Sequence, residues 1–322
     1  MRQVAYPGER PPHAPETGWS ARLLGRFHAT GVFWYRLNRW LVTAAPDWLM
    51  APMIAVLTPF AYAVLVRVRR AIGANLAAAL GPAGFLERQR RCLRTIRNCG
   101  MCLIERYERF STDRPFAIEL EALEHWRAVA DGGRGFVMVT AHLGLYEAGS
   151  MVPVAKEARR VHLVREPELD PRAQAFMRET VAAVEGTHYQ MHFQTGDPLQ
   201  AVALVEALER GEIVAIQADR PHAGGKSVAA TLFGRAFPLP AGPAVLARTA
   251  RVPILPVFAL REGRRRFRLV FRPPIEVRRS ADRGADLSAA IERVAGEIEY
   301  AIRRAPNQWF AFRELWPDRP SR

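Results

Sequence analysis

The sequence predicts an α/β fold in which a sheet is flanked by helices, preceded by N-terminal helices that associate with a membrane. Three observations support this prediction. After about residue 115, short runs rich in Val and Ile alternate with amphipathic segments, a pattern typical of a sheet covered by helices on both faces. Residues 19 to about 110 read as helical throughout. Within them, the run 48–66 is apolar and uncharged, and it reaches the lower length limit of a bilayer span.

The charge balance is unusual for a chain of 322 residues. There are 46 basic and 32 acidic side chains, which give a formal net charge of +14, and nearly all of the basic residues are arginine. A coding sequence rich in GC would favour Arg over Lys but would not explain the net excess. Such a surface suits phosphate-rich or acidic partners: nucleic acid, an anionic bilayer, or an acidic carrier. Nucleic acid is disfavoured because no known binding motif accompanies the charge.

The chain divides into three parts. Residues 1–18 are polar and rich in proline, which predicts a disordered arm without a cleavable signal peptide. Residues 19–66 form the membrane-associated helical segment, and residues 67–322 form the α/β domain. Pro52 and Pro59 interrupt the apolar run, so a kinked element embedded in one leaflet competes with a full span. The arginines that follow at 67–70 favour the cytoplasmic side, and a soluble helix pair is the alternative.

The elements of the α/β domain follow from its periodicity. Gly81-Pro82 marks a helix end, and a further helix containing the cysteines continues to about residue 110. Strands are expected at 135–142, 160–164, 212–218, 252–260 and 266–272. Helices are expected at 145–156, 170–185, 198–210, 241–250 and about 286–304.

The three cysteines, Cys92, Cys99 and Cys102, are spaced to share one face of a helix. The C-x-x-C at 99–102 admits a redox or metal role in principle. No second pair completes a zinc site, so small buried side chains are the favoured interpretation. We expect no metal and no cofactor.

The candidate chemistry centres on His142, which directly follows an apolar strand-like run. Glu147 lies five residues further on, in an H-x-x-x-x-[D/E] motif at a strand–loop–helix junction. A carboxylate on one imidazole nitrogen would fix the tautomer whose other nitrogen takes a proton from a hydroxyl. The motif alone is weak: His192 and Asp197 also match it, though in a polar stretch, and an ordinary hydrogen-bonded histidine is the plain alternative.

Several blocks in order give this motif its context: TAHLGLYEAG, GEIVAIQADRP, LFGRAFPLPAGPAVLARTARVPILPVF and APNQWFAFRELWP. Over roughly residues 65–317 the chain resembles the lauroyl/myristoyl acyltransferases that act late in lipid A biosynthesis, within the lysophospholipid acyltransferase superfamily. Leu145-Tyr146 stand where that family commonly has Asn-Trp, and QADRPHAGG replaces its usual acidic loop. Both departures flank the acceptor side.

The resemblance implies a mixed sheet flanked by helices, as in glycerol-3-phosphate acyltransferases, and an O-acyltransferase at the cytoplasmic face of a bacterial inner membrane. Acyl carrier protein or acyl-CoA would be the donor, and a hydroxyl of a membrane lipid or glycolipid, first a lipid A precursor, would be the acceptor. It implies His142 as base, with Glu147 as its partner. The substrate-binding residues that it implies are Arg165, Asp219, Arg220, Gly234, Gly242 and Pro243, with Pro256 in a further block.

Other interpretations remain open. The acceptor could be a lysophospholipid, a phosphoinositol mannoside or an amino-acid lipid. A lipid or thioester hydrolase could use the same dyad on water, and a non-catalytic membrane-binding protein could use the arginines alone. HAGGKS at 222–227 does not complete a P-loop, and no G-x-S-x-G elbow is present.

Overall fold

The computed structural model of the chain describes residues 32–145, 159–167, 170–185, 188–194, 198–222 and 225–316. The predicted N-terminal arm, the first part of the membrane-associated segment and most of the helix expected at 145–156 lie outside these ranges. Within them, the chain forms the mixed α/β sheet flanked by helices that the sequence predicts.

The main sheet has the strand order β1-β9-β8-β2-β5-β3-β4 within the described residues. Neighbouring strands are parallel except β8 and β9, which form an antiparallel hairpin. The strand bounds are β1 Ala117–Glu121, β2 Phe136–Thr140, β3 Val161–Arg165, β4 Tyr189–Phe193, β5 Ile213–Gln217, β8 Ile254–Gly263 and β9 Arg266–Phe271. Because β2, β5, β3 and β8 are parallel, their carboxyl ends share one edge of the sheet.

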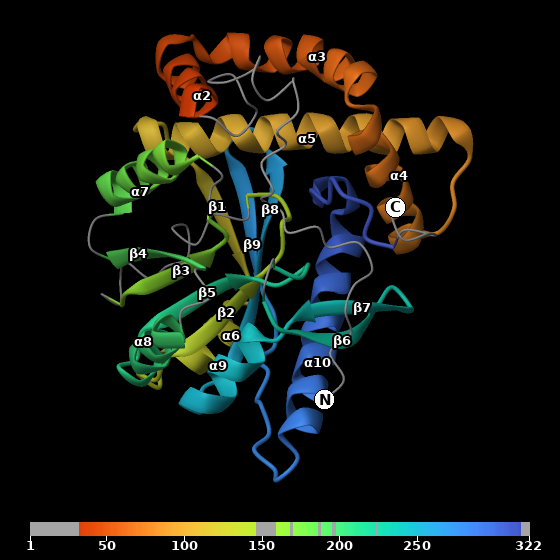
Figure 1. Ribbon diagram of the computed structural model, residues 1–322. Helices are drawn as coiled ribbons and strands as arrows, with labels where there is room; N and C mark the ends of the chain where they lie inside the picture. Colours follow the sequence, from red (N-terminus) through yellow and green to blue (C-terminus); the bar gives the residue numbers. More distant parts are fainter. Residues whose placement is uncertain are drawn as a thin grey trace.

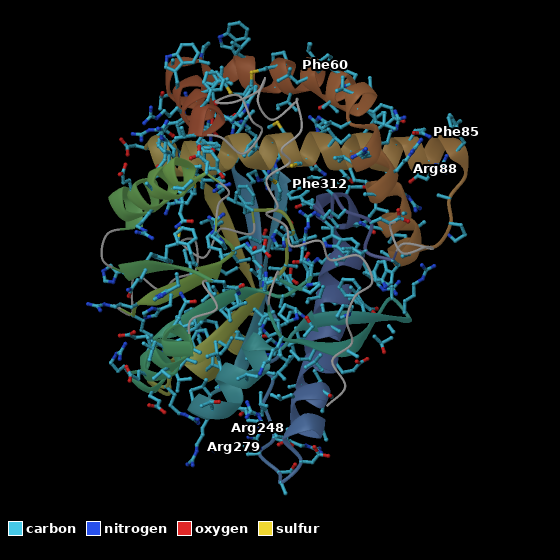
Figure 2. The ribbon with its side chains drawn as sticks, viewed as in Figure 1. Phe60, Phe85, Arg88, Arg248, Arg279 and Phe312 are labelled. Carbon is cyan, nitrogen blue, oxygen red and sulfur yellow. The ribbon has the colours of Figure 1, made fainter. Side chains whose placement is uncertain are left out.

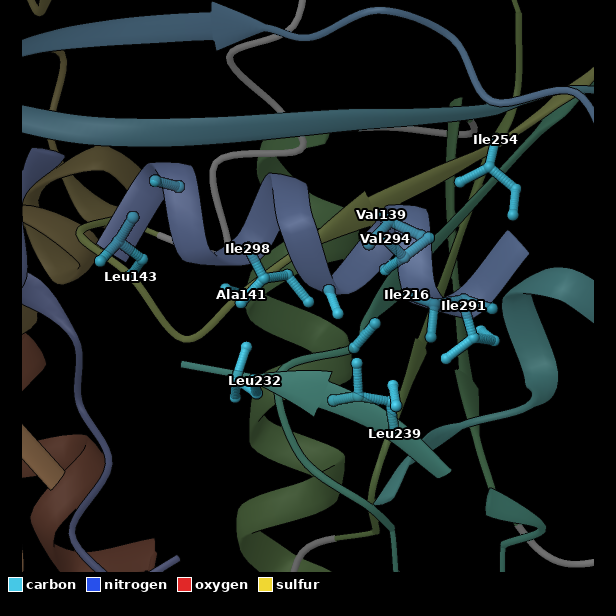
Figure 3. Close-up of a cluster of buried hydrophobic side chains, with 14 of the residues drawn as sticks. Val139, Ala141, Leu143, Ile216, Leu232, Leu239, Ile254, Ile291, Val294 and Ile298 are labelled. Atoms are coloured by element: carbon cyan, nitrogen blue, oxygen red, sulfur yellow. The ribbon is translucent and has the colours of Figure 1, made fainter. Parts of the chain in front are cut away.

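Helices cover both faces of this sheet. On one face lie α9 (Gly242–Ala250), α10 (Arg283–Arg304) and the hairpin of β6 (Ser227–Leu232) and β7 (Arg235–Pro240). Figure 3 shows Ile291, Val294 and Ile298 of α10 directed at the strands. The other face holds α6 (Leu123–Ala130), whose Trp126 packs between Phe136 and Phe271. Burial of the sheet on both faces explains why its central strands are apolar almost throughout.

A long helix, α5 (Phe85–Ser111), crosses the end of the sheet (Figure 1). Its buried carboxylates fix it there: Glu105 pairs with Arg261 at 2.7 Å, and Glu108 pairs with Arg114 at 2.8 Å. Arg264 in the β8–β9 turn also bonds to Glu108. The contacts of Glu105 with Arg261 and of Glu108 with Arg264 join α5 to the β8–β9 hairpin at the edge of the sheet where the chemistry is expected.

Two helices, α2 (Val32–Ala44) and α3 (Asp47–Val64), form an outer layer on α5, on the side away from the sheet (Figure 1). The expected apolar run is one helix despite Pro52 and Pro59. Among the described residues, α3 is long and apolar enough to cross a membrane, but Met50, Ile54 and Thr58 face inward and are buried. Leu65 then breaks α3 from α4 (Val66–Leu80), which returns toward the domain.

The expected elements and the observed ones agree for most of the α/β domain. The five expected strands correspond to β2, β3, β5, β8 and β9, and α7 (Pro171–Glu185), α8 (Pro198–Glu209), α9 and α10 match expected helices within a few residues. β1, α6, β4 and the β6–β7 hairpin were not expected from the sequence. β1 and β4 are the two edge strands, and four of the five residues of β1 are exposed, so neither has the apolar signature used to identify strands.

The contact between α3 and α5 depends on Gly100. A Cβ atom at this position would lie 2.9 Å from Ile54 Cδ1, so a large side chain would force the two helices apart. We expect Gly100→Leu to lower the free energy of unfolding by roughly 1–3 kcal/mol through overpacking and to make α3 sensitive to protease. Denaturant unfolding and limited proteolysis of the purified protein would test this.

Gly296 in α10 provides the matched control, because a Cβ there meets nothing within 4 Å. Gly296→Ala should raise stability by about 0.5–1 kcal/mol through its helix propensity. Equal protease resistance of α3 in Gly100→Leu and wild type would show that the close approach does not hold the outer layer in place.

Candidate active site

His142 and Asp219 meet at the carboxyl edge of the sheet because of strand register. Thr140, the last residue of β2, pairs with Gln217, the last residue of β5. Each strand is followed by alanine, and the Ala218 N–H donates to the Thr140 carbonyl at 2.9 Å, which extends the pairing. His142 and Asp219 therefore occupy equivalent positions, two residues beyond adjacent parallel strands. Such an edge is the usual place for a ligand site in an open α/β sheet.

The Asp219 carboxylate is fully buried and receives donors on both oxygens. His142 Nδ1 lies 2.6 Å from Oδ1, and the His142 backbone N–H donates to the same oxygen at 3.1 Å. Oδ2 accepts from Trp309 Nε1 at 3.1 Å and from Arg220 Nη2 at 2.9 Å. Burial alone would raise the pKa of Asp219, but Arg220 and His142 outweigh burial and hold that pKa well below its ordinary value.

The ionised carboxylate determines the tautomer of His142. An ionised carboxylate can only accept hydrogen bonds, so Nδ1 of His142 carries the hydrogen and Nε2 is the basic nitrogen. Burial lowers the pKa of His142, and Arg220 and His222 lower it further, while Asp219 opposes them. The net shift is downward, so the imidazole is neutral at neutral pH and available as a base.

A cavity of about 240 Å³ lies against this histidine. Its walls combine the loop after β2, the facing side of α5 and the segment after α10. The described residues that line it are Cys99, Cys102, Leu103, Arg106, His142, Gly144, Leu145, Arg220, Phe310 and Phe312. The mixture of apolar walls with one base and two guanidinium groups is typical of a site for an amphiphilic substrate.

Arg220 bonds to the Asp219 carboxylate and also lines the cavity. It also donates to the Phe310 carbonyl at 3.3 Å, and its Nε is buried without a hydrogen-bond partner among the described residues.

Two cysteines line the cavity. Burial raises the pKa of Cys99 to about 12 and that of Cys102 well above its ordinary value. The raised pKa values favour the protonated thiols, which act as part of the cavity wall rather than as nucleophiles. Cys92 and Cys102 are buried, as the sequence predicts, whereas Cys99 is half-buried.

The loop after His142 is held by the backbone. Gly144 has a φ of +58°, and a Cβ there would lie 2.1 Å from the Ala259 carbonyl oxygen. The Gly144 N–H donates to the Gln308 carbonyl at 3.0 Å, and Leu143 bridges to Trp309. Only glycine allows this approach, so the loop that follows His142 packs directly against β8 and the C-terminal segment.

The other residues predicted from sequence are distributed around this centre. Glu147 lies outside the described residues, so its pairing with His142 stays a prediction. Arg220 lines the cavity, whereas Asp219 stands behind His142 instead of on the cavity wall. The remaining predicted residues are not among the described residues lining this cavity: Arg165 ends β3, Gly234 lies in the β6–β7 turn, Gly242 and Pro243 begin α9, and Pro256 lies in β8 beside Val139.

The second motif match has a different environment. His192 Nε2 lies 2.8 Å from His162 Nδ1, and His162 Nε2 lies 2.6 Å from Glu212. Asp197 lies outside the described residues. His192 therefore belongs to a chain of polar side chains across β4, β3 and the start of β5, and it does not line the cavity that contains His142.

Trp309 and Arg106 were not expected at the site, and the family resemblance implied a contact of Asp219 with substrate. A signal for the Asp219 contact was present: VMVTAH and VAIQAD both end an apolar run with Ala and a polar residue. If the two strands are neighbours, their terminal polar residues must meet. Trp309 and Arg106 had no comparable signal, because their approach depends on how α5 and the C-terminal segment cross the sheet edge.

Comparison with known proteins gives this site its context. The family model described as bacterial lipid A biosynthesis acyltransferase matches residues 21–317. The chain belongs to this family. The match confirms the family predicted from the motif blocks. The protein is therefore an enzyme, which removes the non-catalytic alternative.

A crystal structure of the 1-acyl-sn-glycerophosphate acyltransferase PlsC from Thermotoga maritima is similar at 12% identity and a TM-score of 0.35. The similarity covers 80% of the acyltransferase chain and 97% of the PlsC chain. No curated protein matched the sequence.

The Asp219 contact predicts how His142 titrates. Asp219→Asn keeps the shape but removes the charge that raises the pKa of His142, so that pKa should fall below its wild-type value. NMR titration of the labelled imidazole would measure this shift. Glu147→Gln is the matched comparison, since it removes the carboxylate predicted from the motif. An unchanged pKa in Asp219→Asn, with a lowered one in Glu147→Gln, would assign the pairing to Glu147.

Proposed function

We propose that this acyltransferase moves a fatty acyl group from an acyl thioester to a hydroxyl of a membrane glycolipid, with a lipid A precursor as the first choice of acceptor. The observation that carries the proposal is the 2.6 Å contact between His142 Nδ1 and the buried Asp219, which makes Nε2 a base at the cavity wall. The family supplies the reaction class. The donor, acyl carrier protein or CoA, is acidic in either case and suits the +14 chain.

The proposed reaction is a direct transfer. The acceptor hydroxyl loses its proton to His142 Nε2 while its oxygen attacks the thioester carbonyl carbon. The resulting oxyanion lies near a cation, for which Arg220 on the cavity wall is suited. The C–S bond then breaks, the ester is released, and the imidazolium returns the proton to the thiolate. The protonated cysteines are consistent with a route that has no acyl-enzyme intermediate.

In this mechanism Asp219 orients His142 and does not touch the substrate. Its carboxylate fixes the Nδ1–H tautomer and stabilises the imidazolium formed during attack. Arg220 contacts both groups: it bonds to Asp219, and it lines the cavity in which the substrate is proposed to bind. Glu147 is proposed, from the motif, as a further carboxylate near the histidine.

Kinetics of three variants would test these roles. His142→Ala should lower turnover by roughly 10²–10⁴-fold, as expected for loss of a general base. Asp219→Asn should lower turnover strongly with little change in donor KM, because the imidazolium exists only beyond the ground state. Steady-state rates with a saturating acyl thioester and a lipid A precursor would measure both, with Glu147→Gln as the comparison. Near-normal turnover of His142→Ala would refute the assignment.

The pH dependence has a definite sign. The base form of His142 is lost as pH falls through its pKa, which lies below the ordinary 6.5. Activity should therefore hold at neutral pH and decline only below pH 6.5. In Asp219→Asn the declining limb of the pH–activity profile should move to lower pH.

The same assays separate the two reaction classes. Release of free fatty acid without an acceptor would indicate a hydrolase instead of an acyltransferase.

We further propose attachment to the cytoplasmic face of the inner membrane through α3, lying in one leaflet rather than spanning the bilayer. One side of α3 contacts α5, and Asp47 at its start pairs with Arg264 at 2.9 Å. On its other side, Trp48, Val56 and Phe60 are 73%, 70% and 67% exposed. A helix fastened on one side and apolar on the other fits the interface of a membrane.

Replacing Val56 and Phe60 by Gln should weaken binding to vesicles. Each large apolar group inserted into lipid contributes roughly 1.5 kcal/mol or more, so the double variant should bind about 100-fold more weakly. Flotation with liposomes would measure this.

The matched control replaces Leu199 and Val202, which are 74% and 53% exposed on α8 at the opposite end of the molecule (Figure 1). This control should bind as wild type. Equal losses in both variants would contradict insertion through α3.

A further inference from the structure

A second cavity, between α4 and the first part of α5, is not used by the proposed reaction. Its volume is about 740 Å³, larger than that of the cavity against His142, and the two share no lining residue. On α5, the nearest residues of the two cavities are Cys92 and Cys99. Seven helical residues rise about 10 Å, so the second cavity is a separate place on the same helix.

The lining of this cavity is strongly cationic. Arg69, Arg70, Arg88 and Arg91 contribute to it, and among the described residues no Asp or Glu does. Arg91 pairs with Glu87 at 3.1 Å. Arg69 lies over the Tyr62 ring at 4.6 Å, and Arg88 lies near the Phe85 ring at 5.9 Å.

Arg70 and Arg88 have no carboxylate partner in the part of the chain that the structure describes. Several guanidinium groups at one cavity repel each other unless an anion lies between them. Guanidinium is also the side chain best matched to phosphate, which it binds through two parallel hydrogen bonds.

Apart from Tyr62 and Gln89, the rest of the cavity lining is apolar or small. Leu76 and Pro82 line the cavity beside the arginines. Phe85, which lines the cavity at the start of α5, is 67% exposed, and its neighbour Leu86 is 80% exposed. Figure 2 shows Phe85 and Arg88 together at this end of α5. The cavity thus offers arginines for a phosphate and apolar side chains for a hydrocarbon chain, beside a helix proposed to lie in a leaflet. A phospholipid at the membrane surface has both groups.

We propose that this cavity binds the phosphodiester headgroup of an anionic phospholipid, with Arg70 and Arg88 at the phosphate and Phe85 beside the first part of an acyl chain. The bound lipid is neither acyl donor nor acceptor. It holds the enzyme at the bilayer in addition to α3 and sets the orientation of α5, which also lines the catalytic cavity. The binding does not rest on the reaction proposed for His142, so it is measurable in His142→Ala.

The test compares two double variants with the same loss of charge. Arg70→Gln with Arg88→Gln removes cavity arginines from α4 and α5. Arg67→Gln with Arg90→Gln removes exposed arginines from the same helices that do not line the cavity. Native mass spectrometry of full-length protein in detergent, with added phosphatidylglycerol or phosphatidylcholine, measures the retained lipid.

Wild type and the Arg67/Arg90 variant should retain one phosphatidylglycerol in preference to phosphatidylcholine. The Arg70/Arg88 variant should bind phosphatidylglycerol at least about tenfold more weakly, as expected for lost hydrogen bonds to a charged group. Ala77→Phe, which narrows the cavity without changing charge, should give the same loss and covers the case in which the arginine variant does not fold.

Three outcomes would overturn the proposal. Equal lipid retention by both double variants would show that general charge is responsible. Full displacement of phosphatidylglycerol by an equal concentration of inorganic phosphate would show a site for free phosphate. A raised KM for acyl carrier protein in the Arg70/Arg88 variant, with lipid retention unchanged, would assign the cavity to the carrier.

Discussion

The buried carboxylate of Asp219 is the interaction on which the arrangement of the site depends. Its two oxygens accept donors from the loop after β2, from its own neighbour Arg220 and from Trp309 in the C-terminal segment. Three parts of the chain that are far apart in sequence are therefore fixed relative to one charge. An ionised group can be fully buried only if such donors replace its water. Arg220 and His142 keep Asp219 ionised, and the ionised carboxylate fixes the tautomer of His142. One set of contacts therefore stabilises the buried charge and prepares the base.

The location of the site could be predicted from the sequence, because β2 and β5 are apolar runs whose ends are marked by polar residues. The placement of His142 directly after a strand is confirmed. The neighbour of that strand could not be predicted, since periodicity identifies strands but not their order in a sheet. The resemblance implied a contact of Asp219 with substrate, whereas the pairing of Thr140 with Gln217 places Asp219 against His142. The edge strands were missed for a related reason, because a strand with solvent on one side has a weak apolar pattern.

The membrane segment shows a different limit. Residues 48–66 are apolar enough for a bilayer span or for an interfacial helix, and composition alone cannot separate these. The structure adds two tertiary contacts of α3, the packing of Ile54 on Gly100 and the pairing of Asp47 with arginines after β8. Gly100, Arg264 and Arg265 lie far from the run in sequence, so hydropathy alone gives no sign of these contacts. Both contacts support the proposal that α3 lies in one leaflet.

The position of Trp309 has a consequence for synthesis. A ribosome exposes residues 32–64, and with them the apolar surface of α3, long before it adds residue 309. Until then the Asp219 carboxylate lacks one of its donors and the cavity lacks the wall formed by Phe310 and Phe312. The nascent chain thus exposes the apolar surface of α3 well before its catalytic cavity is complete.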